Sequence, residues 1–295
     1  MTISQSYLSF NGQPVSERIL SSFLNDRGLA YGHGLFESIL LHDSKLCLID
    51  RHLSRLSLGA TKLNIPLEPA QVLDCLDLFI NQLTHGAVEQ GVIKVIVTAG
   101  EGGRGYQSPD DIKPTVICSY STLPEGLSDY RVQRLSVRYC EHRLAVNGVL
   151  AGIKHLNRLD QVIARNEWHC GSYQEGLMFT ESNHLIEAVS ANVFVKNAKG
   201  QWLTPSLKQV GIAGVMRSLM LDEIFPACSI PVTVAPIMMG ELTDCQSLLL
   251  CNSVKGLASV GQIHNQPSAW HKSLPIDQQT LMLYEKLIEL YPQYK

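Results

Sequence analysis

The stretch Ala151-Gly152-Ile153-Lys154-His155-Leu156-Asn157-Arg158-Leu159-Asp160-Gln161 places one lysine after a small, apolar approach. Burial lowers the pKa of a lysine and makes its amine a nucleophile, which is what Schiff-base chemistry requires. A lysine that extends from a loop into solvent is the more common alternative. Lys154 is therefore a candidate for covalent chemistry whose role depends on the segments around it.

A carboxylate follows in the segment His184-Leu185-Ile186-Glu187-Ala188-Val189-Ser190. A carboxylate among apolar and small neighbours is costly to bury unless it holds a cation, and a protonated pyridine nitrogen would be such a cation. A glutamate at a strand end in solvent is the alternative, and position alone leaves both open. Glu187 is a second candidate site residue.

Two glycines flank a turn at Gly211-Ile212-Ala213-Gly214, and an apolar stripe at helical spacing follows it. A glycine turn that opens a helix leaves backbone N–H groups unpaired at the positive end of the helix dipole, which suits a phosphate. An ordinary loop-to-helix junction is the more frequent reading of such a motif. The turn is a candidate phosphate site only in combination with other residues.

Arginines mark two further segments. In Asp50-Arg51-His52-Leu53-Ser54-Arg55-Leu56, His52 and Arg55 lie a turn apart on one helix face, and a guanidinium at Arg55 suits phosphate geometry. The glycine-rich loop Gly100-Glu101-Gly102-Gly103-Arg104-Gly105-Tyr106 ends a buried strand and carries one arginine. A solvated helix face and a plain mobile loop are the respective alternatives.

The composition narrows the class of protein. The chain has 295 residues, 45% of them hydrophobic and 17% charged, with a net charge of −3, which fits one or two folded domains. Lys and Arg are spread thinly, so we expect no nucleic-acid partner, and no apolar run is long enough to cross a membrane. Eight scattered cysteines without a Cys-x-x-Cys pair, and no visible signal peptide, indicate a cytoplasmic enzyme.

Strands and helices mix without regular βαβ alternation, which predicts an α+β fold in two domains, residues 1–122 and 123–295. In the first domain we predict strands over 35–41, 45–48, 91–99 and 115–120, and helices over about 50–65 and 72–83. In the second we predict strands over 131–137, 176–180, 192–195, 247–250 and 258–263, and helices over about 157–170, 214–225 and 276–290.

Several catalytic signatures are missing from the sequence. It contains no His-Glu-x-x-His and no paired spacing of histidine with cysteine or carboxylate, so we expect no metal site. It also lacks the Gly-x-Ser-x-Gly of α/β-hydrolases and the Gly-x-Gly-x-x-Gly of dinucleotide-binding proteins.

Taken in order, these segments resemble the class IV aminotransferase family, the fold-type IV enzymes that use pyridoxal 5′-phosphate. The resemblance covers nearly the whole chain, from Arg27–Glu37 through His52–Leu56 and Lys154 to Glu187 and Gly214–Arg217. It implies a small α+β domain and a larger domain with a barrel-like β core and flanking helices. Within the family, residues 102–106 and 151–161 are most similar to lyases, and chance agreement over the second stretch is improbable.

The resemblance implies a role for each matching residue. Lys154 would form the Schiff base with the cofactor, and Glu187 would pair with the pyridine nitrogen. The phosphate would be held by Arg55, by the backbone amides of Val215 and Met216, and by the hydroxyl of Ser253.

The lyase reaction implied is the conversion of 4-amino-4-deoxychorismate to 4-aminobenzoate and pyruvate. Ser38 matches the position of a hydroxyl that would protonate the departing enolpyruvate, and Lys94, Arg104 and Asn252 match positions that would face the substrate carboxylates. The resemblance also implies a homodimer, in which the loop around Arg104 lies near the partner's site, and a functional coupling to aminodeoxychorismate synthase.

Two positions depart from the common family pattern. Leu159 stands where aminotransferases of this family usually carry a tyrosine, which favours a lyase, and His33 stands where the family usually has aspartate. The alternatives are an aminotransferase acting on branched-chain or D-amino acids, and a dimeric binding protein that kept the fold and lost the chemistry. The joint presence of Lys154, Glu187 and Arg55 favours an enzyme over a binding protein.

Overall fold

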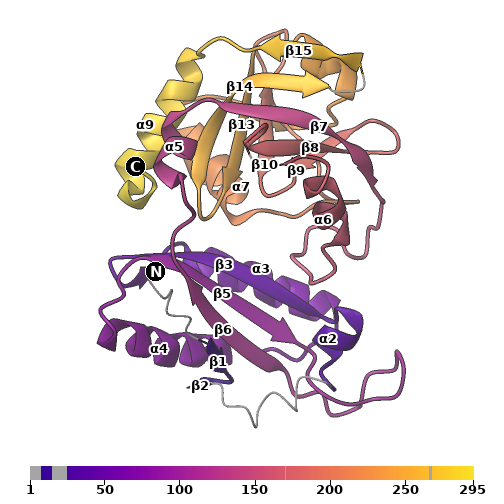
Figure 1. The fold of residues 1–295 in the computed structure, drawn as a ribbon, viewed down its shortest axis with the longest axis vertical. Coiled ribbons are helices and arrows are strands. Elements are labelled where there is room, and N and C mark those ends of the chain that lie inside the picture. Colours follow the sequence, from indigo (N-terminus) through magenta and orange to yellow (C-terminus); the bar gives the residue numbers. More distant parts are fainter. Residues whose placement is uncertain (1–7, 15–24, 170, 266–267) are drawn as a thin grey trace. The chain divides into compact units, whose positions relative to one another are not determined.

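The structure is a computed structural model, and it describes residues 8–14, 25–169, 171–265 and 268–295 (Figure 1). It divides into two compact units. The smaller unit comprises Met1–Pro124 and Ile153–Asn157, and the larger comprises Glu125–Gly152 and Arg158–Lys295. The chain therefore passes between the units three times, rather than once after residue 122 as the sequence analysis expected.

The smaller unit is built on a six-stranded sheet in the order β2-β1-β6-β5-β3-β4. All neighbours pair antiparallel. The strands are β1 (Leu8–Phe10), β2 (Gln13–Pro14), β3 (Gly34–His42), β4 (Lys45–Leu46), β5 (Gly91–Thr98) and β6 (Thr115–Ser121), and the helices are α2 (Arg27–Tyr31), α3 (Ile49–Lys62) and α4 (Pro69–His85). The strands and helices predicted for this part of the chain are all present, with ends shifted by a few residues.

One face of this sheet carries the core. Along β5, Ile93, Val95 and Val97 are buried while Lys94 between them is exposed, which is the alternation expected of a strand with one covered face. Helices α3 and α4 lie against the sheet (Figure 1). The apolar stripe of each helix is buried, including Leu56 on α3 and Phe79 on α4. The opposite face of the sheet holds the less buried residues.

The segment Ile153–Asn157 groups with the smaller unit, although the sequence analysis assigned Lys154 to the larger domain. The reason is backbone pairing to the start of β3: the N–H of Phe36 donates to the carbonyl of Lys154 at 3.0 Å, and the N–H of Leu156 donates to the carbonyl of Gly34 at 3.0 Å. Pairing across such a distance in sequence cannot be read from local composition.

The larger unit is built on a nine-stranded sheet in the order β12-β11-β10-β13-β14-β7-β8-β9, with β15 paired to β14. Pairs β11–β12, β14–β7 and β7–β8 are parallel and the others antiparallel. The strands are β7 (Leu135–Leu144), β8 (Glu175–Thr180), β9 (Leu185–Ala188), β10 (Asn192–Lys196), β11 (Trp202–Thr204), β12 (Val232–Val234), β13 (Ser247–Asn252), β14 (Gly256–Asn265) and β15 (Trp270–Ser273).

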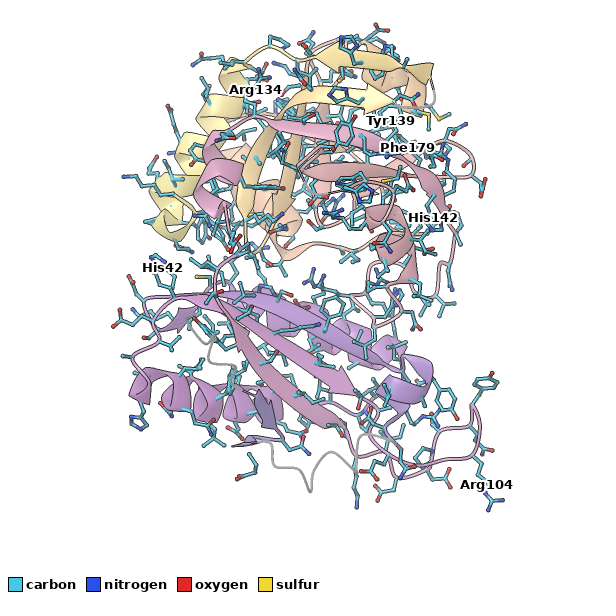
Figure 2. All side chains as sticks on the ribbon, viewed as in Figure 1. His42, Arg104, Arg134, Tyr139, His142 and Phe179 are labelled. Atoms are coloured by element: carbon cyan, nitrogen blue, oxygen red, sulfur yellow. The ribbon has the colours of Figure 1, made fainter. Side chains whose placement is uncertain are left out.

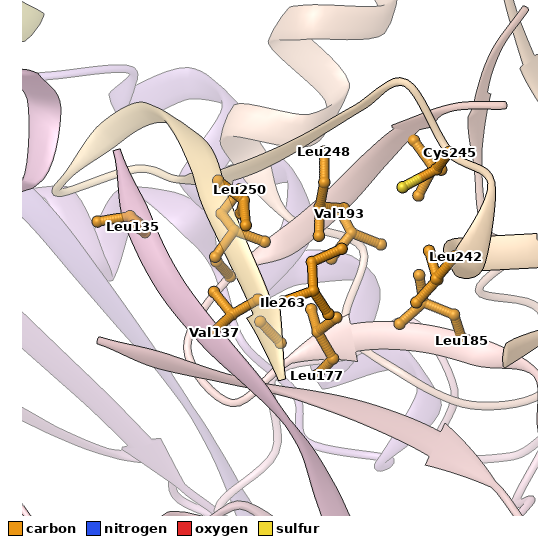
Figure 3. Packing of buried hydrophobic residues seen from close by; sticks show 14 of the residues in the cluster. Leu135, Val137, Leu177, Leu185, Val193, Leu242, Cys245, Leu248, Leu250 and Ile263 are labelled. Atoms are coloured by element: carbon orange, nitrogen blue, oxygen red, sulfur yellow. The ribbon is translucent and has the colours of Figure 1, made fainter. Parts of the chain in front are cut away.

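This sheet curls back on itself. Strand β9 ends the order, yet a turn of three residues joins it to β10, from which four other strands separate it in that order. The turn closes with the N–H of Ala188 donating to the carbonyl of Ala191 at 2.7 Å. Figure 3 shows the apolar side chains that fill the curl, among them Val137, Leu177, Val193, Leu250 and Ile263. The predicted α+β fold with a barrel-like core is confirmed.

Helices flank the larger sheet. They are α5 (Leu127–Val132), α6 (Leu159–Arg165), α7 (Val215–Leu219), which continues through the π-helical η1 (Met220–Ile224) into α8 (Phe225–Ala227), and α9 (Gln278–Leu290), with 3₁₀ turns η2 (Met239–Thr243) and η4 (Pro292–Tyr294). The strand predicted over 131–137 is wrong at its start, because residues 131 and 132 complete α5. The helix predicted over 157–170 is shorter than expected, and its last residue, Cys170, lies outside the described residues.

Across the described ranges, no helix is long and apolar enough to cross a membrane. Within the same ranges no two cysteines form a disulfide, and six of the seven cysteines described are buried.

Candidate active site

Lys154 lies beside the aromatic ring of Phe36. Its Nζ is 4.2 Å from the ring centre, and the Nζ of Lys94 is 5.2 Å from the same centre. Ser38 pairs directly with Lys94 in the β3–β5 register, so Phe36, Ser38 and Lys94 share one sheet face. Three of the candidate residues therefore gather around one ring, on the face of the sheet that is less buried than the helix-covered one.

Glu37 points to the other face of the sheet, where α3 covers it. Its carboxylate accepts hydrogen bonds from Arg55 Nε at 2.8 Å, Arg55 Nη2 at 2.5 Å and His52 Nδ1 at 2.6 Å. Glu37 and His52 are both almost fully buried, at 1% and 0% exposed. The expectation that His52 and Arg55 face the same way is confirmed, and the residue they share is one that the sequence analysis had not singled out.

The electrostatics of this cluster are dominated by the ion pair. Burial by itself raises the pKa of the Glu37 carboxyl, but Arg55 and the His52 hydrogen bond outweigh it and lower that pKa to about 2. Burial lowers the pKa of His52, against the opposing influence of Glu37, and the positive charges of Arg55 and Lys154 lower it further. His52 is therefore a neutral imidazole with its proton on Nδ1, and its buried Nε2 has no hydrogen-bond partner among the described residues.

Glu187 lies on β9 in the larger unit and is 3% exposed. Its Oε1 accepts a hydrogen bond from Gln161 Nε2 at 3.2 Å, and its Oε2 accepts one from the backbone N–H of Ile212 at 2.8 Å. Arg158 lies close enough for the Glu187 charge to raise its pKa, although burial lowers that pKa more. The carboxylate is thus buried and held in one orientation, as an acceptor for a cation should be.

The glycine turn is built around Glu187 and Asn192. Gly211 has a φ of +91°, and a side chain there would lie 3.2 Å from Glu187 Oε2. Asn192 Nδ2 donates to the carbonyl of Ile212 at 2.9 Å, and a Cβ on Gly214 would lie only 1.9 Å from Asn192 Oδ1. At both positions neighbouring side chains leave no room for a Cβ atom, so only glycine fits.

Gly214 is the N-cap of α7, so the N–H groups of Val215 and Met216 belong to the first helical turn and have no acceptor within the helix. The sequence analysis had proposed this arrangement for the turn from its glycine spacing alone. The two backbone donors are available to an anion at the start of the helix.

Asn252 is the last residue of β13, and Ser253 begins the turn between β13 and β14. Asn252 Oδ1 accepts hydrogen bonds from the backbone N–H groups of Val254 at 3.1 Å and Lys255 at 2.7 Å, and its Nδ2 donates to the carbonyl of Ser190 at 3.0 Å. The side chain of Asn252 therefore shapes this turn, a role that the sequence analysis did not assign to it.

Arg104 is not part of the group around Phe36. Figure 2 shows it at the tip of its loop, pointing away from the smaller unit. Its neighbours Gly103, Gly105 and Tyr106 are exposed as well.

Among the described residues, no three histidine, cysteine or acidic side chains come together in a way that could hold a metal ion. The candidate chemistry rests instead on one lysine, two buried carboxylates, one arginine and a helix start. Gln161 and Glu37 were missed as partners of site residues, although Gln161 is part of the stretch that drew attention to Lys154.

Comparison with known proteins decides the family. A model of the class IV aminotransferases matches residues 34–263, most of the chain. The chain belongs to the class IV aminotransferase family. Members of this family are pyridoxal phosphate enzymes.

Two of the most similar proteins are lyases of this family. The aminodeoxychorismate lyase of Vibrio harveyi is 33% identical over 242 residues, 81% of this chain and 86% of the relative. The crystal structure of 4-amino-4-deoxychorismate lyase from Pseudomonas aeruginosa is 34% identical, with a TM-score of 0.85 over 96% of this chain and 98% of that one. A putative branched-chain-amino-acid aminotransferase of Methanocaldococcus jannaschii is 26% identical over 86% of both chains.

Proposed function

We propose that this chain is an aminodeoxychorismate lyase, an enzyme of folate biosynthesis that converts 4-amino-4-deoxychorismate to 4-aminobenzoate and pyruvate. The observation that carries the proposal is identity of 33% and 34% to two lyases over most of the chain. The cluster of Lys154, Lys94 and Ser38 around Phe36 supports it, because an elimination needs a base close to cationic and hydroxyl groups.

Pyridoxal 5′-phosphate is the cofactor that we infer for this site, and the residues present fit it. Lys154 offers the amine, Glu187 a buried acceptor for a protonated ring nitrogen, and Arg55 a cation for the phosphate. Val215 and Met216 offer backbone donors for the same phosphate, and Ser253 a hydroxyl. The buried Nε2 of His52 and Oε1 of Gln161 also make no hydrogen bond among the described residues, which is typical of polar atoms that a ligand completes.

When bound, pyridoxal phosphate supplies an electron sink at the carbon that carries the substrate amine. We propose that Lys154 would hold the cofactor through its Nζ, and that the same amine would remove the proton from this carbon. Glu187 would keep the proton on the ring nitrogen, because Gln161 and Ile212 hold its buried carboxylate in one orientation. The carbon–oxygen bond to the enolpyruvyl group then breaks, and the ring becomes aromatic.

The remaining residues act on the leaving group and the carboxylates. Ser38 donates a proton to the departing enolpyruvate carbon, which leaves as pyruvate, so that the proton removed at one carbon is matched by one gained at another. Lys94 and Arg104 bind the two substrate carboxylates, with Asn252 as a further donor. These assignments are proposals that rest on the resemblance to lyases and on the shared sheet face of Ser38 and Lys94.

A class IV aminotransferase acting on branched-chain or D-amino acids is the second candidate. The relative from M. jannaschii, named as a putative branched-chain-amino-acid aminotransferase, favours it. Leu159, where aminotransferases of the family usually carry a tyrosine, opposes it.

We also propose a homodimer that is functionally coupled to aminodeoxychorismate synthase and acts in the cytoplasm. Exposed apolar side chains on α2 and the neighbouring loop, Leu29 at 67% and Tyr106 at 88%, suit a surface that a second copy covers. The absence of disulfides among the described cysteines is consistent with a reducing compartment.

The test is direct conversion. Purified protein with pyridoxal phosphate, and its Lys154→Ala variant, are supplied with aminodeoxychorismate, and 4-aminobenzoate and pyruvate are followed together. We expect equal amounts of both products from the wild type, none from Lys154→Ala, and full activity from Lys199→Ala, which removes an exposed lysine from the turn after β10. A protein that binds the cofactor but forms neither product would contradict the lyase assignment. Transamination would then be assayed with a series of amino donors and 2-oxoglutarate.

A further inference from the structure

Arg27, the first residue of α2, is a buried guanidinium with no carboxylate partner among the described residues. It is 3% exposed. Its Nη1 donates to the carbonyl oxygens of Gly102 at 3.1 Å, Gln107 at 3.1 Å and Gly105 at 3.4 Å, and its Nη2 donates to that of Tyr106 at 2.9 Å. A buried charge is tolerated only where its hydrogen-bonding groups are satisfied, and here one loop, Gly102–Gln107, satisfies them.

The conformation of this loop depends on its closeness to Arg27. Gly103 has a φ of +80°, and a Cβ there would lie 2.3 Å from the Gln107 carbonyl oxygen and 2.9 Å from Arg27 Nη1. Only glycine fits such an approach. Arg104 follows directly, at the tip of the loop (Figure 2). The inward side of the loop is thus fixed by one cation, while its outward side carries another.

His33 fixes the guanidinium from the other side. Its Nδ1 lies 3.3 Å from Arg27 Nε, and its Nε2 lies 2.9 Å from the carbonyl oxygen of Leu63 at the end of α3. A carbonyl oxygen only accepts and an arginine nitrogen only donates, so Nε2 carries the hydrogen and Nδ1 carries the lone pair. Only this neutral tautomer makes both hydrogen bonds.

The backbone leaves His33 little freedom. Its N–H donates to the carbonyl of Arg27 at 3.2 Å, and its carbonyl accepts from the N–H of Ala99 at 3.0 Å. The start of α2 is held in turn by Asp26, which accepts from the N–H of Gly28 and from the hydroxyl of Thr98, both at 2.7 Å. The ring of Tyr31 covers the Arg27 guanidinium, with Arg27 Cζ 5.0 Å from the ring centre.

We propose that Arg27 and His33 are positioning residues. His33 orients the Arg27 guanidinium, and Arg27 holds the loop Gly102–Gln107 in the conformation that presents Arg104 to a carboxylate of the substrate at the site of the partner subunit in the proposed homodimer. The second half of this inference rests on the proposed function, whereas the anchoring of the loop does not. It also gives His33 a role, because its Nδ1 accepts the hydrogen bond from Arg27 Nε.

Two matched variants separate the two hydrogen bonds of His33. In His33→Asn, Oδ1 can take the place of Nδ1 and accept from Arg27, whereas in His33→Gln the amide nitrogen can take the place of Nε2 and donate to Leu63. Loop order is measured as the rate of tryptic cleavage after Arg104, followed by mass spectrometry, with cleavage after the exposed Lys199 as the internal reference.

Loss of a hydrogen bond to the buried charge should raise cleavage after Arg104 about tenfold in His33→Gln and at least as much in Arg27→Lys. Cleavage after Lys199 should not change. In the same variants we expect KM for aminodeoxychorismate to rise about tenfold with kcat within about twofold, whereas His33→Asn should resemble the wild type in both measurements. Arg27→Lys is chosen over Arg27→Met because it keeps a cation at this buried position and is therefore more easily tolerated by the fold.

Unchanged cleavage after Arg104 in both His33→Gln and Arg27→Lys would overturn the anchoring. Increased cleavage with an unchanged KM would overturn the presentation of Arg104 to substrate. An Arg104→Ala variant distinguishes these results from a failure of the proposed function. If its KM equals that of the wild type, Arg104 does not bind substrate, and the proposal that the loop presents Arg104 is wrong. The cleavage rates still test the anchoring of the loop by Arg27.

Discussion

At the scale of single residues, the Glu37 carboxylate determines how the cationic side of the site is arranged. Arg55 is held by two hydrogen bonds to Glu37, and His52 donates a third to the same carboxylate from Nδ1. Because a guanidinium bound in this way along one edge has a defined direction, Glu37 sets where the remaining edge of Arg55 points. The orientation of the arginine is therefore a property of the protein before any cofactor arrives.

We predict that Glu37→Gln destabilises the protein at neutral pH and removes part of its acid sensitivity. The Glu37 pKa lies at about 2 instead of its ordinary 4.5, and at about 1.4 kcal/mol per unit the ionised carboxylate contributes about 3 kcal/mol. A lowered pKa gives stability that is complete above pH 4.5 and lost as the pH falls towards 2. Urea unfolding at pH 7 and at pH 3 measures it.

The control for this experiment is Asp111→Asn, because Asp111 is exposed and its carboxylate pairs only with an exposed lysine. We expect the wild type and Asp111→Asn to lose stability in parallel as the pH falls, and Glu37→Gln to lose less. A Glu37→Gln protein whose free energy of unfolding equals that of the wild type at pH 7 would contradict the stabilising ion pair.

At the scale of elements, the start of α7 depends on the close packing of Gly214 against Asn192. Asn192 holds the carbonyl of Ile212, and the N–H of Ile212 holds Glu187. Strands β9 and β10 and the turn before α7 are thus linked by consecutive hydrogen bonds. A disturbance at the helix start is expected to reach the carboxylate on β9.

We predict that Gly214→Ala weakens binding of pyridoxal phosphate by at least about tenfold. The added Cβ would lie 1.9 Å from Asn192 Oδ1, so Asn192 has to move and its hydrogen bond to Ile212 is lost. Titration of the apoprotein with pyridoxal phosphate, followed by its absorbance, measures the affinity. Gly240→Ala is the matched control, because no heavy atom lies within 4 Å of a Cβ at Gly240. Equal affinities for the two variants would remove α7 from the cofactor site.

The elements also indicate what sequence alone could predict. Strands β5 and β6 and helices α3 and α4 follow from local patterns of apolar residues, and the glycine turn before α7 follows from its spacing. The prediction of a strand over 131–137 was wrong at Arg131, which belongs to α5. The Arg131 guanidinium donates hydrogen bonds to the carbonyls of Val254 and Lys255, which lie more than a hundred residues further along the sequence. The partners of Glu187 and Glu37 were missed for the same reason, since each hydrogen bond joins separate elements.

At the scale of the whole molecule, the residues proposed to bind the cofactor are distributed over both units. Lys154 and Arg55 belong to the smaller unit, and Glu187, Val215 and Met216 belong to the larger. A ligand that binds residues of a folded unit stabilises that unit by mass action. The cofactor is therefore expected to stabilise both.

We predict that pyridoxal phosphate raises the melting temperature of both units in differential scanning calorimetry. At a concentration one hundred times its Kd, one bound ligand contributes about 2.7 kcal/mol. The apoprotein should melt at lower temperature, in one transition or in two, and each should rise with the cofactor. In Lys154→Ala the rise should be smaller. A rise confined to one of two transitions would contradict the cofactor-binding roles proposed for the residues of the other unit.

The return of Ile153–Asn157 to the smaller unit has a consequence for how this protein can be divided. A gene fragment that ends near residue 124 encodes six strands but omits the five residues that pair with Gly34 and Phe36, so the start of β3 would become an open edge. Open edges recruit other chains. The smaller unit is therefore not encoded by one uninterrupted piece of the gene, and a fragment that ends near residue 124 is expected to associate with other chains through this edge.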